Sequence, residues 1–294
     1  RVVSTEYMMK LLDPAYVSKR GPVSQRKRQL PAFSVATITP VNFPSSTLPI
    51  APYLLGILLG DGHFADHGVS FSTVDLEILE SADSLIPQEC NLTQADAYSY
   101  RIVKNTNKQS PYPNPMLIKL KALGLYGTRS HTKFIPEMYM RADITDRFNL
   151  LQGLMDTDGH ADPRGSCATY STTSFRLAQQ TQQLVWSLGG LTKIQEMPPR
   201  TSNRKPFFVL HPHLPDNKML FKLSRKRNRF HRITGVYRYI KAIKYDREAE
   251  CQCITVAASD GLYIKDNYTP THNSYLLDGL CPSTKIAEVT TAFG

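Results

Sequence analysis

The feature that most constrains this chain is an apolar stretch that occurs twice. Residues 54–62 read Leu-Leu-Gly-Ile-Leu-Leu-Gly-Asp-Gly, and residues 150–159 read Leu-Leu-Gln-Gly-Leu-Met-Asp-Thr-Asp-Gly. The two align so that Asp61 matches Asp158, 97 positions later (158 − 61). A repeat of this period is the size of a domain, so the chain is predicted to contain two related structural units.

Small residues recur four positions apart in each copy. They are Gly56 and Gly60 in the first copy and Gly153 and Thr157 in the second. Residues at this spacing lie on one face of a helix, and a face without bulk lets two helix backbones approach closely. The two stretches are therefore predicted to form helices that pack against each other, with the leucines burying the contact.

A carboxylate ends each predicted helix. Gly62 and Gly159 stand where a left-handed helix cap is expected, which puts Asp61 and Asp158 in the last turns. The negative end of the helix dipole and a second nearby carboxylate both disfavour ionisation unless a divalent cation lies between them. The pair therefore indicates a metal site for phosphodiester hydrolysis, in which the cation activates water and stabilises the leaving oxyanion.

Other interpretations fit one copy but not both. A single apolar stretch that ends in Asp-Gly is usually a core helix followed by a turn, and the duplication argues against this reading. An EF-hand loop is excluded because the glycine of residues 156–159 comes too early. A membrane span is excluded because each apolar run covers about ten residues where about twenty are needed.

The two stretches resemble the paired motifs of the LAGLIDADG homing endonucleases, in the single-chain form, over approximately residues 48–232. The resemblance implies that Asp61 and Asp158 are catalytic, that Mg²⁺ is the cofactor and that the partner is double-stranded DNA. It implies an α+β fold in which two pseudo-symmetric αββαββα halves, residues 48–145 and 146–235, form a saddle on the DNA major groove. Such a protein would act as a monomer.

The charge balance favours a polyanionic partner. Lys and Arg number 35 against 25 Asp and Glu, a net charge of +10, although many basic proteins are merely soluble. Residues 1–47 are predicted to be a basic linker from an upstream splicing region, with a short helix at 5–12. The five cysteines form no regular framework, and no signal peptide or membrane span is visible, which favours the cytoplasm.

Around each motif the sequence predicts alternating strands and helices. In the first half we expect strands near 69–73 and 98–104, with helices at 75–86 and 118–123. In the second half we expect a helix at 174–188 and strands near 191–197 and 207–210. Alternate polar residues on the outer faces of these strands would contact base edges, and basic residues would bind phosphates.

Several basic residues are candidates for contact with DNA. Residues 131–136, His-Thr-Lys-Phe-Ile-Pro, resemble the Lys-x-Ile-Pro segment of intein-borne endonucleases, so Lys133 is a candidate for stabilising charge near the scissile phosphate. Its counterpart in the second half is guessed to be Lys205. Either could instead be an ordinary surface lysine. A basic run at 222–232 is predicted to bind DNA phosphates, or else to be a solvated helix end; its candidates are Arg225, Lys226, Arg227 and Arg229.

The C-terminal part carries residues for a different reaction. An Asn side chain can attack its own backbone carbonyl and cut the chain after itself, if a neighbouring His assists proton transfer. Here His272 precedes Asn273, and Ser274 supplies a hydroxyl nucleophile. The tripeptide alone is common. An alternative use of nearby residues, a zinc site made from Cys251, Cys253 and the histidines at 211 and 213, is weak because alternate residues of a strand point the same way anyway.

Residues 250–274 resemble the C-terminal splicing blocks of inteins. The resemblance implies a small all-β Hedgehog/intein-like segment at 236–273, in which Asn273 cyclises with help from His272. Residues 274–294 would then be host-protein sequence, the C-extein, beginning with Ser274. Ser-Tyr-Leu-Leu at 274–277 could continue a phosphate-binding loop interrupted before its Ser, but the glycine-rich half is not in this sequence.

The intein resemblance is incomplete at the other end. An intein begins with Cys or Ser and has a Thr-x-x-His block, and this sequence begins at Arg1 with neither. We therefore expect splicing to require an N-terminal intein half as partner. Two rival functions stay open: a DNA-binding or maturase-like protein without nuclease activity, and a splicing element with a degenerate nuclease.

Overall fold

The structure is a computed structural model. It describes residues 5–12, 33–64, 68–105, 113–199, 201, 205–249, 256–257, 259, 261–272 and 284–293. The chain divides into two compact units. The larger comprises residues 39–234, and the smaller combines residues 1–38 with residues 235–294.

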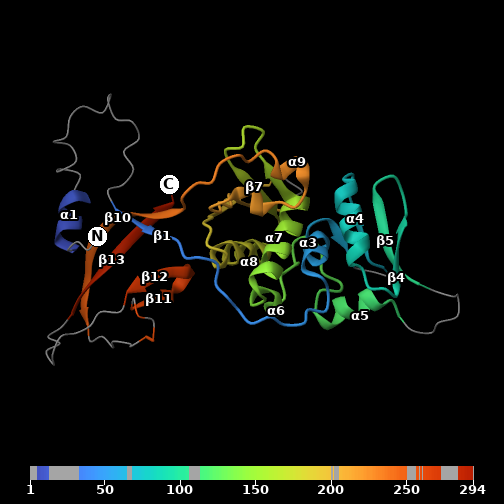
Figure 1. Cartoon of the computed structure of the whole chain (residues 1–294), viewed down its shortest axis with the longest axis horizontal. Coiled ribbons are helices and arrows are strands. Elements are labelled where there is room, and N and C mark those ends of the chain that lie inside the picture. The colour runs from blue at the N-terminus through green and yellow to red at the C-terminus, as the bar shows by residue number, and fades with distance from the viewer. Residues whose placement is uncertain are drawn as a thin grey trace. The chain divides into compact units, whose positions relative to one another are not determined.

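Two helices from the repeated stretches pack together inside the larger unit (Figure 1). Helix α3 (Pro52–Asp61) has Pro in its first turn, where no hydrogen-bonding N–H is needed. Helix α7 (Ile144–Asp158) begins six residues before the repeat (150 − 144), because the Asp143 side chain caps it by accepting a 2.9 Å hydrogen bond from the Asp146 N–H. Asp61 and Asp158 are the last residues of their helices, as the sequence predicts.

Each motif helix leads into a four-stranded antiparallel sheet. The first sheet contains β2 (Gly62–His63), β3 (Ser70–Ser72), β4 (Cys90–Gln94) and β5 (Ser99–Lys104). The second contains β6 (Gly159–Ala161), β7 (Ala168–Thr172), β8 (Ile194–Met197) and β9 (Phe207–Leu210). Their spatial orders are β2-β3-β5-β4 and β6-β7-β9-β8. Both sheets thus order their strands as first, second, fourth and third.

Short helices complete the larger unit. They are α4 (Leu76–Leu85), α5 (Pro115–Ala122), α6 (Glu137–Met140), α8 (Phe175–Ser187), the 3-10 helix η2 (Asn217–Leu220) and α9 (Ser224–Arg227). The strands and helices expected around each motif are confirmed to within a few residues. Strand β4 was not predicted, because its sequence Cys-Asn-Leu-Thr-Gln shows little apolar alternation and most of its residues are exposed.

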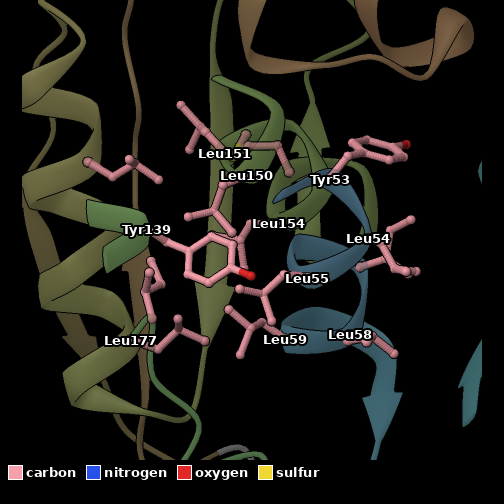
Figure 2. Packing of buried hydrophobic residues seen from close by; sticks show 14 of the residues in the cluster. Tyr53, Leu54, Leu55, Leu58, Leu59, Tyr139, Leu150, Leu151, Leu154 and Leu177 are labelled. Carbon is pink, nitrogen blue, oxygen red and sulfur yellow. The ribbon is translucent and has the colours of Figure 1, made fainter. Parts of the chain in front are cut away.

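The core of the larger unit is centred on the contact between the two motif helices. Figure 2 shows Leu55 and Leu59 of α3 facing Leu150 and Leu154 of α7, and all four are almost fully buried. Tyr139 of α6 packs beside them, and its hydroxyl bonds both backbone groups of Ile50, accepting from N–H at 2.9 Å and donating to C=O at 2.7 Å. At about 25 cal/mol per Å² of apolar surface, such burial is the main force that holds the helix pair together.

A buried arginine fixes the segment that enters this unit. Arg147 on α7 is fully buried and donates to Ala142 O at 2.9 Å and to Ser187 Oγ at 2.6 Å. It also donates to Val41 O, and the Val41 N–H donates in turn to Ser187 O at 2.9 Å. The chain before the first motif helix is therefore tied to α7 and α8.

The smaller unit is mainly antiparallel strand. Its three-stranded sheet has the order β1 (Ser34–Ala36), β10 (Tyr237–Ala249) and β13 (Thr284–Phe293), and helix α1 (Thr5–Leu12) contacts β10. A hairpin pairs β11 (Leu262–Lys265) with β12 (Thr269–His272) across the short helix η3 (Asp266–Tyr268). The predicted helix at 5–12 is confirmed, whereas β1 was not predicted. Among the described residues, no helix is long and apolar enough to cross a membrane.

Candidate functional site

The two motif helices cross where the small residues lie. A Cβ atom added to Gly56 would lie 2.5 Å from Leu150 O and 2.8 Å from Gly153 Cα. A Cβ on Gly60 would lie 2.7 Å from the Thr157 Cβ. All these distances are below van der Waals contact, so the close approach predicted from the spacing is confirmed, and it brings the C-terminal ends of the two helices together.

The glycines that follow the aspartates are not left-handed caps, so that prediction was wrong. Gly62 has φ −81° and ψ 150°, and Gly159 has φ −89° and ψ 151°, both in the extended region. Glycine is needed for space instead. A Cβ on Gly62 would lie 2.6 Å from Leu58 Cα, and one on Gly159 would lie 2.8 Å from Met155 Cα. The chain therefore turns directly from each helix into a strand.

Asp61 and Asp158 line one cavity of about 530 Å³ at the ends of the helices. Asp158 Oδ2 lies 3.4 Å from the position that a Gly60 Cβ would occupy, so its carboxylate crosses toward the other motif helix. His131 and Lys205 line the same cavity, as do Ser171 and neighbouring residues of the second sheet. The structure thus brings the two predicted aspartates into a single site.

The electrostatics of this site disfavour two free carboxylates. Solvent reaches both side chains, but the surrounding protein removes much of their hydration, which raises the pKa of both. For Asp158 the pKa rises to about 7, with the charge of Asp61 as a second cause. A group with this pKa is partly protonated at neutral pH, and a nearby cation would favour its ionised form.

Lys133 is placed at the end of the first motif helix. Its side chain is buried, 3% exposed, and Nζ donates to Leu58 O at 3.0 Å, Gly60 O at 3.0 Å and Gly62 O at 2.7 Å. An ammonium has three hydrogens, and three carbonyls accept here. Burial lowers the Lys133 pKa to about 8, and Asp158 and Asp61 oppose this shift. Lys133 therefore caps α3 and offsets the negative end of its dipole.

Lys226 does the same for the second motif helix. Nζ donates to Met155 O at 3.0 Å, Asp156 O at 2.7 Å and Gly159 O at 2.6 Å. Met155 and Gly159 are the repeat counterparts of the Leu58 and Gly62 carbonyls that Lys133 binds. Lys226 is 6% exposed, and burial lowers its pKa to about 8. Its burial contradicts the expected surface position, and all three ammonium hydrogens are donated to carbonyls inside the protein.

The guess that Lys205 is the counterpart of Lys133 was also wrong in position. Lys205 is exposed and lines the cavity, whereas the helix-capping place belongs to Lys226. Of the other predicted basic residues, Arg225 is ion-paired with Asp75 at 2.7 Å and Arg229 donates to Ala161 O at 2.5 Å. Arg227 is exposed. Only Lys205 and Arg227 of this set are largely open to solvent without a described ion pair.

A second carboxylate of the repeat, Asp156, has a role that sequence reasoning missed. It is 2% exposed, and Oδ2 accepts from the Tyr53 hydroxyl at 2.8 Å and from Leu223 N–H at 3.0 Å. Burial raises its pKa to about 6. Asp156 therefore joins α7 to α3 and to the segment before Lys226. The available signal was that its repeat counterpart is an ordinary apolar residue, Leu59.

The outer face of the first sheet carries polar side chains, as expected. In the first sheet Ser72, Thr93 and Arg101 are exposed, while the alternate residues Phe71 and Ile102 are buried. Arg101 pairs in register with Thr93 on the neighbouring strand. This face offers hydrogen-bonding groups of the kind that contact base edges and phosphates.

The aspartate pair fits a hard divalent cation. In the part of the chain that the structure describes, no cluster of three or more His, Cys, Asp or Glu side chains is arranged to hold a metal ion. The fit rests on two carboxylates that share a cavity and whose raised pKa values a cation would lower. Carboxylate oxygens with water are the ligand set that Mg²⁺ prefers.

The predicted splicing residues are described only in part. His272 ends strand β12, and its backbone pairs with Leu262, whereas Asn273 and Ser274 lie outside the described residues. For the alternative zinc site, Cys251 and Cys253 also lie outside them. His213 is hydrogen-bonded to Asn217 and Thr234, at 3.1 and 3.0 Å.

Residues 146–231 match the family model described as a LAGLIDADG-like domain. The match runs from α7 through α9 and includes Asp158 and Lys226.

Two curated relatives are replicative DNA helicases named DnaB. The protein from Mycobacterium intracellulare is 26% identical over 250 residues, which is 83% of this chain. The protein from Nostoc sp. (strain PCC 7120) is 26% identical over 212 residues, or 66% of this chain. The chain spans only 38% and 23% of the lengths of these two relatives.

Solved structures of the homing endonuclease I-DmoI are similar to part of the chain. A structure of mesophilic I-DmoI variants has a TM-score of 0.39 at 12% identity, and covers 58% of this chain and 86% of that chain. The complex of I-DmoI with DNA and Ca has a TM-score of 0.36 at 14% identity, and covers 57% and 84%.

Proposed function

We propose that the larger unit is a site-specific DNA endonuclease that cleaves both strands of a long target by hydrolysis. The observation that carries this proposal is the pairing of Asp61 and Asp158, which end two crossed helices and line one cavity. Both sequence copies keep the carboxylate, and the structure gives both a raised pKa. Such a pair is costly unless it binds a cation, and structural carboxylates are rarely arranged this way.

In the proposed reaction Asp61 and Asp158 would hold Mg²⁺ in the cavity. A bound cation would supply Lewis-acid chemistry there, which would lower the pKa of water and stabilise the leaving oxygen. In the hydrolysis the oxygen of water bonds to phosphorus and that water gives up a proton, while the bond from phosphorus to the 3′ oxygen breaks and the 3′ oxygen takes up a proton. Lys133 and Lys226 hold the ends of the two helices and offset their negative dipoles, so the carboxylates stay fixed and able to ionise. Lys205 and His131 line the same cavity, in which the scissile phosphate would lie.

The DNA would lie across the outer faces of the two sheets. The matching strand orders support a pseudo-symmetric pair of halves in one monomeric chain. Exposed residues such as Ser72, Thr93 and Arg101 would contact bases and phosphates of one half-site. The net charge of +10 would favour association with DNA and make binding sensitive to salt.

The test is cleavage of a plasmid that carries the host gene joined across the insertion point. With Mg²⁺ the wild-type chain is expected to linearise it, and EDTA, Asp61→Asn or Asp158→Asn is expected to stop the reaction. Salt-dependent binding without metal-dependent cutting would support the inactive DNA-binding alternative. Full cutting by either variant would refute the catalytic assignment.

We also propose that the nuclease is inserted in a protein-splicing element of a DnaB-type helicase. Supporting features are the sequence His272-Asn273-Ser274, of which His272 ends strand β12, and the two helicase relatives. With an added N-terminal intein half, splicing is expected to join the flanking sequences. The chain alone is expected to release residues 274–294 slowly, as mass spectrometry would detect. Release that continues in Asn273→Ala would refute the cyclisation step.

A further inference from the structure

We propose that Asp75 and Glu77, at the start of helix α4 in the first half, are positioning residues for Lys226 at the Asp158 end of the second motif helix. The inference rests on the proposed nuclease function, because it assigns these residues a part in the reaction. It means that one half of the molecule sets the geometry of the carboxylate supplied by the other half.

Two polar contacts hold helix α9 against helix α4. Arg225 Nε donates to Asp75 Oδ1 and Arg225 Nη2 to Asp75 Oδ2, each at 2.7 Å, which is a bidentate pair. Glu77 Oε2 accepts from Ser224 N–H at 2.9 Å, and Glu77 Oε1 accepts from Ser224 Oγ. The hydrogen bonds from Arg225 and Ser224 lower the pKa of Asp75 and Glu77 respectively. Both carboxylates are therefore ionised at neutral pH.

Helix α9 depends on such contacts because it is too short to be stable alone. It has four residues, and Leu223 at its N-cap position makes no side-chain cap. Glu77 accepts from the first helical N–H, as a capping residue would. Lys226 directly follows Arg225, and its Nζ reaches three carbonyls at the end of α7. A shift of α9 would therefore move the ammonium away from those carbonyls.

The other lysine is held across the halves in the same way. Ser174, at the start of α8 in the second half, donates its hydroxyl to Lys133 O at 2.7 Å. The Gln180 side chain accepts from Ile135 N–H at 2.8 Å and donates to Ile135 O at 2.6 Å. The arrangement therefore occurs twice, which argues against an accidental surface contact. Only the Lys226 side uses charged pairs, so it can be tested by exchanging charges.

A structural role alone predicts a different result from a positioning role. The Arg225 side chain is 51% exposed and that of Asp75 is 16% exposed. A pair that is partly open to solvent contributes less to stability than a buried one, so loss of the Asp75 pair should lower the urea midpoint of unfolding only slightly. A small displacement near the reacting groups can nevertheless reduce a rate by one or two orders of magnitude. The effect should appear in cleavage, because Asp158 and Asp61 line one cavity and Lys226 holds the end of the helix that carries Asp158.

The experiment compares Asp75→Asn, Arg225→Asp and the exchange Asp75→Arg with Arg225→Asp. Each single variant is expected to slow linearisation of the plasmid roughly tenfold, and the exchange is expected to restore it. The matched control is Glu137→Gln. It removes the exposed 2.9 Å pair between Glu137 of α6 and Arg141, the residue after that helix, and the variant is expected to cut both strands normally.

A second measurement does not depend on cleavage. In protein labelled with ¹³C at lysine Cε, the Lys226 signal is expected to titrate near pH 8 in the wild type and in Glu137→Gln. Burial is the largest cause of this low pKa, and the charges of Asp156, Asp75 and Asp158 oppose it. Loss of the Asp75 charge alone would lower the Lys226 pKa further, whereas release of Lys226 from its buried place would raise it. We therefore expect the pKa to rise in Asp75→Asn. A Lys226 pKa that stays near 8 or falls in Asp75→Asn, or single variants that cut both strands like wild type, would overturn the inference. If the wild type does not cut DNA, the nuclease proposal fails, and the titration still decides whether α4 positions Lys226.

Discussion

Replacing Gly56 with Ala should test whether close helix contact holds the aspartate site together. The new Cβ would lie 2.5 Å from Leu150 O and 2.8 Å from Gly153 Cα, and ordinary contacts begin at 3.4 Å. Both obstacles are backbone atoms, so the helices must separate by roughly 1 Å. Overpacking costs about 1–3 kcal/mol, and the separated leucines lose about 1–2 kcal/mol more of packing. Alanine regains about 1 kcal/mol of helix propensity. The net loss is about 1–4 kcal/mol.

Urea unfolding followed by fluorescence of Trp186, the single tryptophan, measures this loss in the larger unit. The matched control is Gly68→Ala, because nothing lies within 4 Å of a Cβ there, and its free energy of unfolding should stay within about 0.5 kcal/mol of wild type. The same separation should move Asp61 away from Asp158 and abolish cleavage. If the Gly56 and Gly68 variants unfold at the same urea concentration, the reasoning about the crossing is wrong.

Three further predictions use the same unfolding assay or its thermal equivalent. The Asp158 pKa is raised to about 7 from an ordinary value of 3.8, so between these pH values the folded state binds more protons than the unfolded state. In EDTA, the free energy of unfolding should therefore fall as pH rises from 4 to 8. Asp158→Asn should flatten this slope, and equal slopes in the variant and the wild type would contradict the argument. Tyr53→Phe removes the 2.8 Å bond to buried Asp156 and should cost about 1–3 kcal/mol. Arg147→Lys retains the charge but loses the planar set of donors to Ser187 and Val41, and should cost about 2–4 kcal/mol; a loss below about 1 kcal/mol would show that the arginine is dispensable.

The parts of the site that could be predicted from sequence are those encoded locally and repeated. The two motif helices, their close crossing and the terminal aspartates follow from four-residue spacing that occurs twice. Most strands and helices around them also follow from local periodicity. Strand β2, with two residues, is too short to give a pattern, and β4 is largely polar.

The parts that could not be predicted depend on contacts between distant residues. Lys226 lies 71 positions from Met155, whose carbonyl it binds. It belongs to a basic run, and the sequence does not indicate which of the basic residues caps the helix. The bond between Tyr53 and Asp156 joins residues 103 positions apart. The conformation at Gly62 was mispredicted because two different needs, a left-handed φ and lack of space, both select glycine.

Each half of the larger unit holds the lysine segment of the other half, and this limits how halves from different proteins can be combined. Helix α4 holds the segment that caps α7, and helix α8 holds the segment that caps α3. A chimera that takes one half from a different protein of this architecture would bring foreign partners to both lysine segments, even if the crossing of α3 and α7 were preserved. Exchange of target specificity between relatives should therefore succeed when only the exposed residues of the strands are transplanted. It should also succeed when each segment is transferred together with the residues that hold it, which are Asp75, Glu77, Ser174 and Gln180.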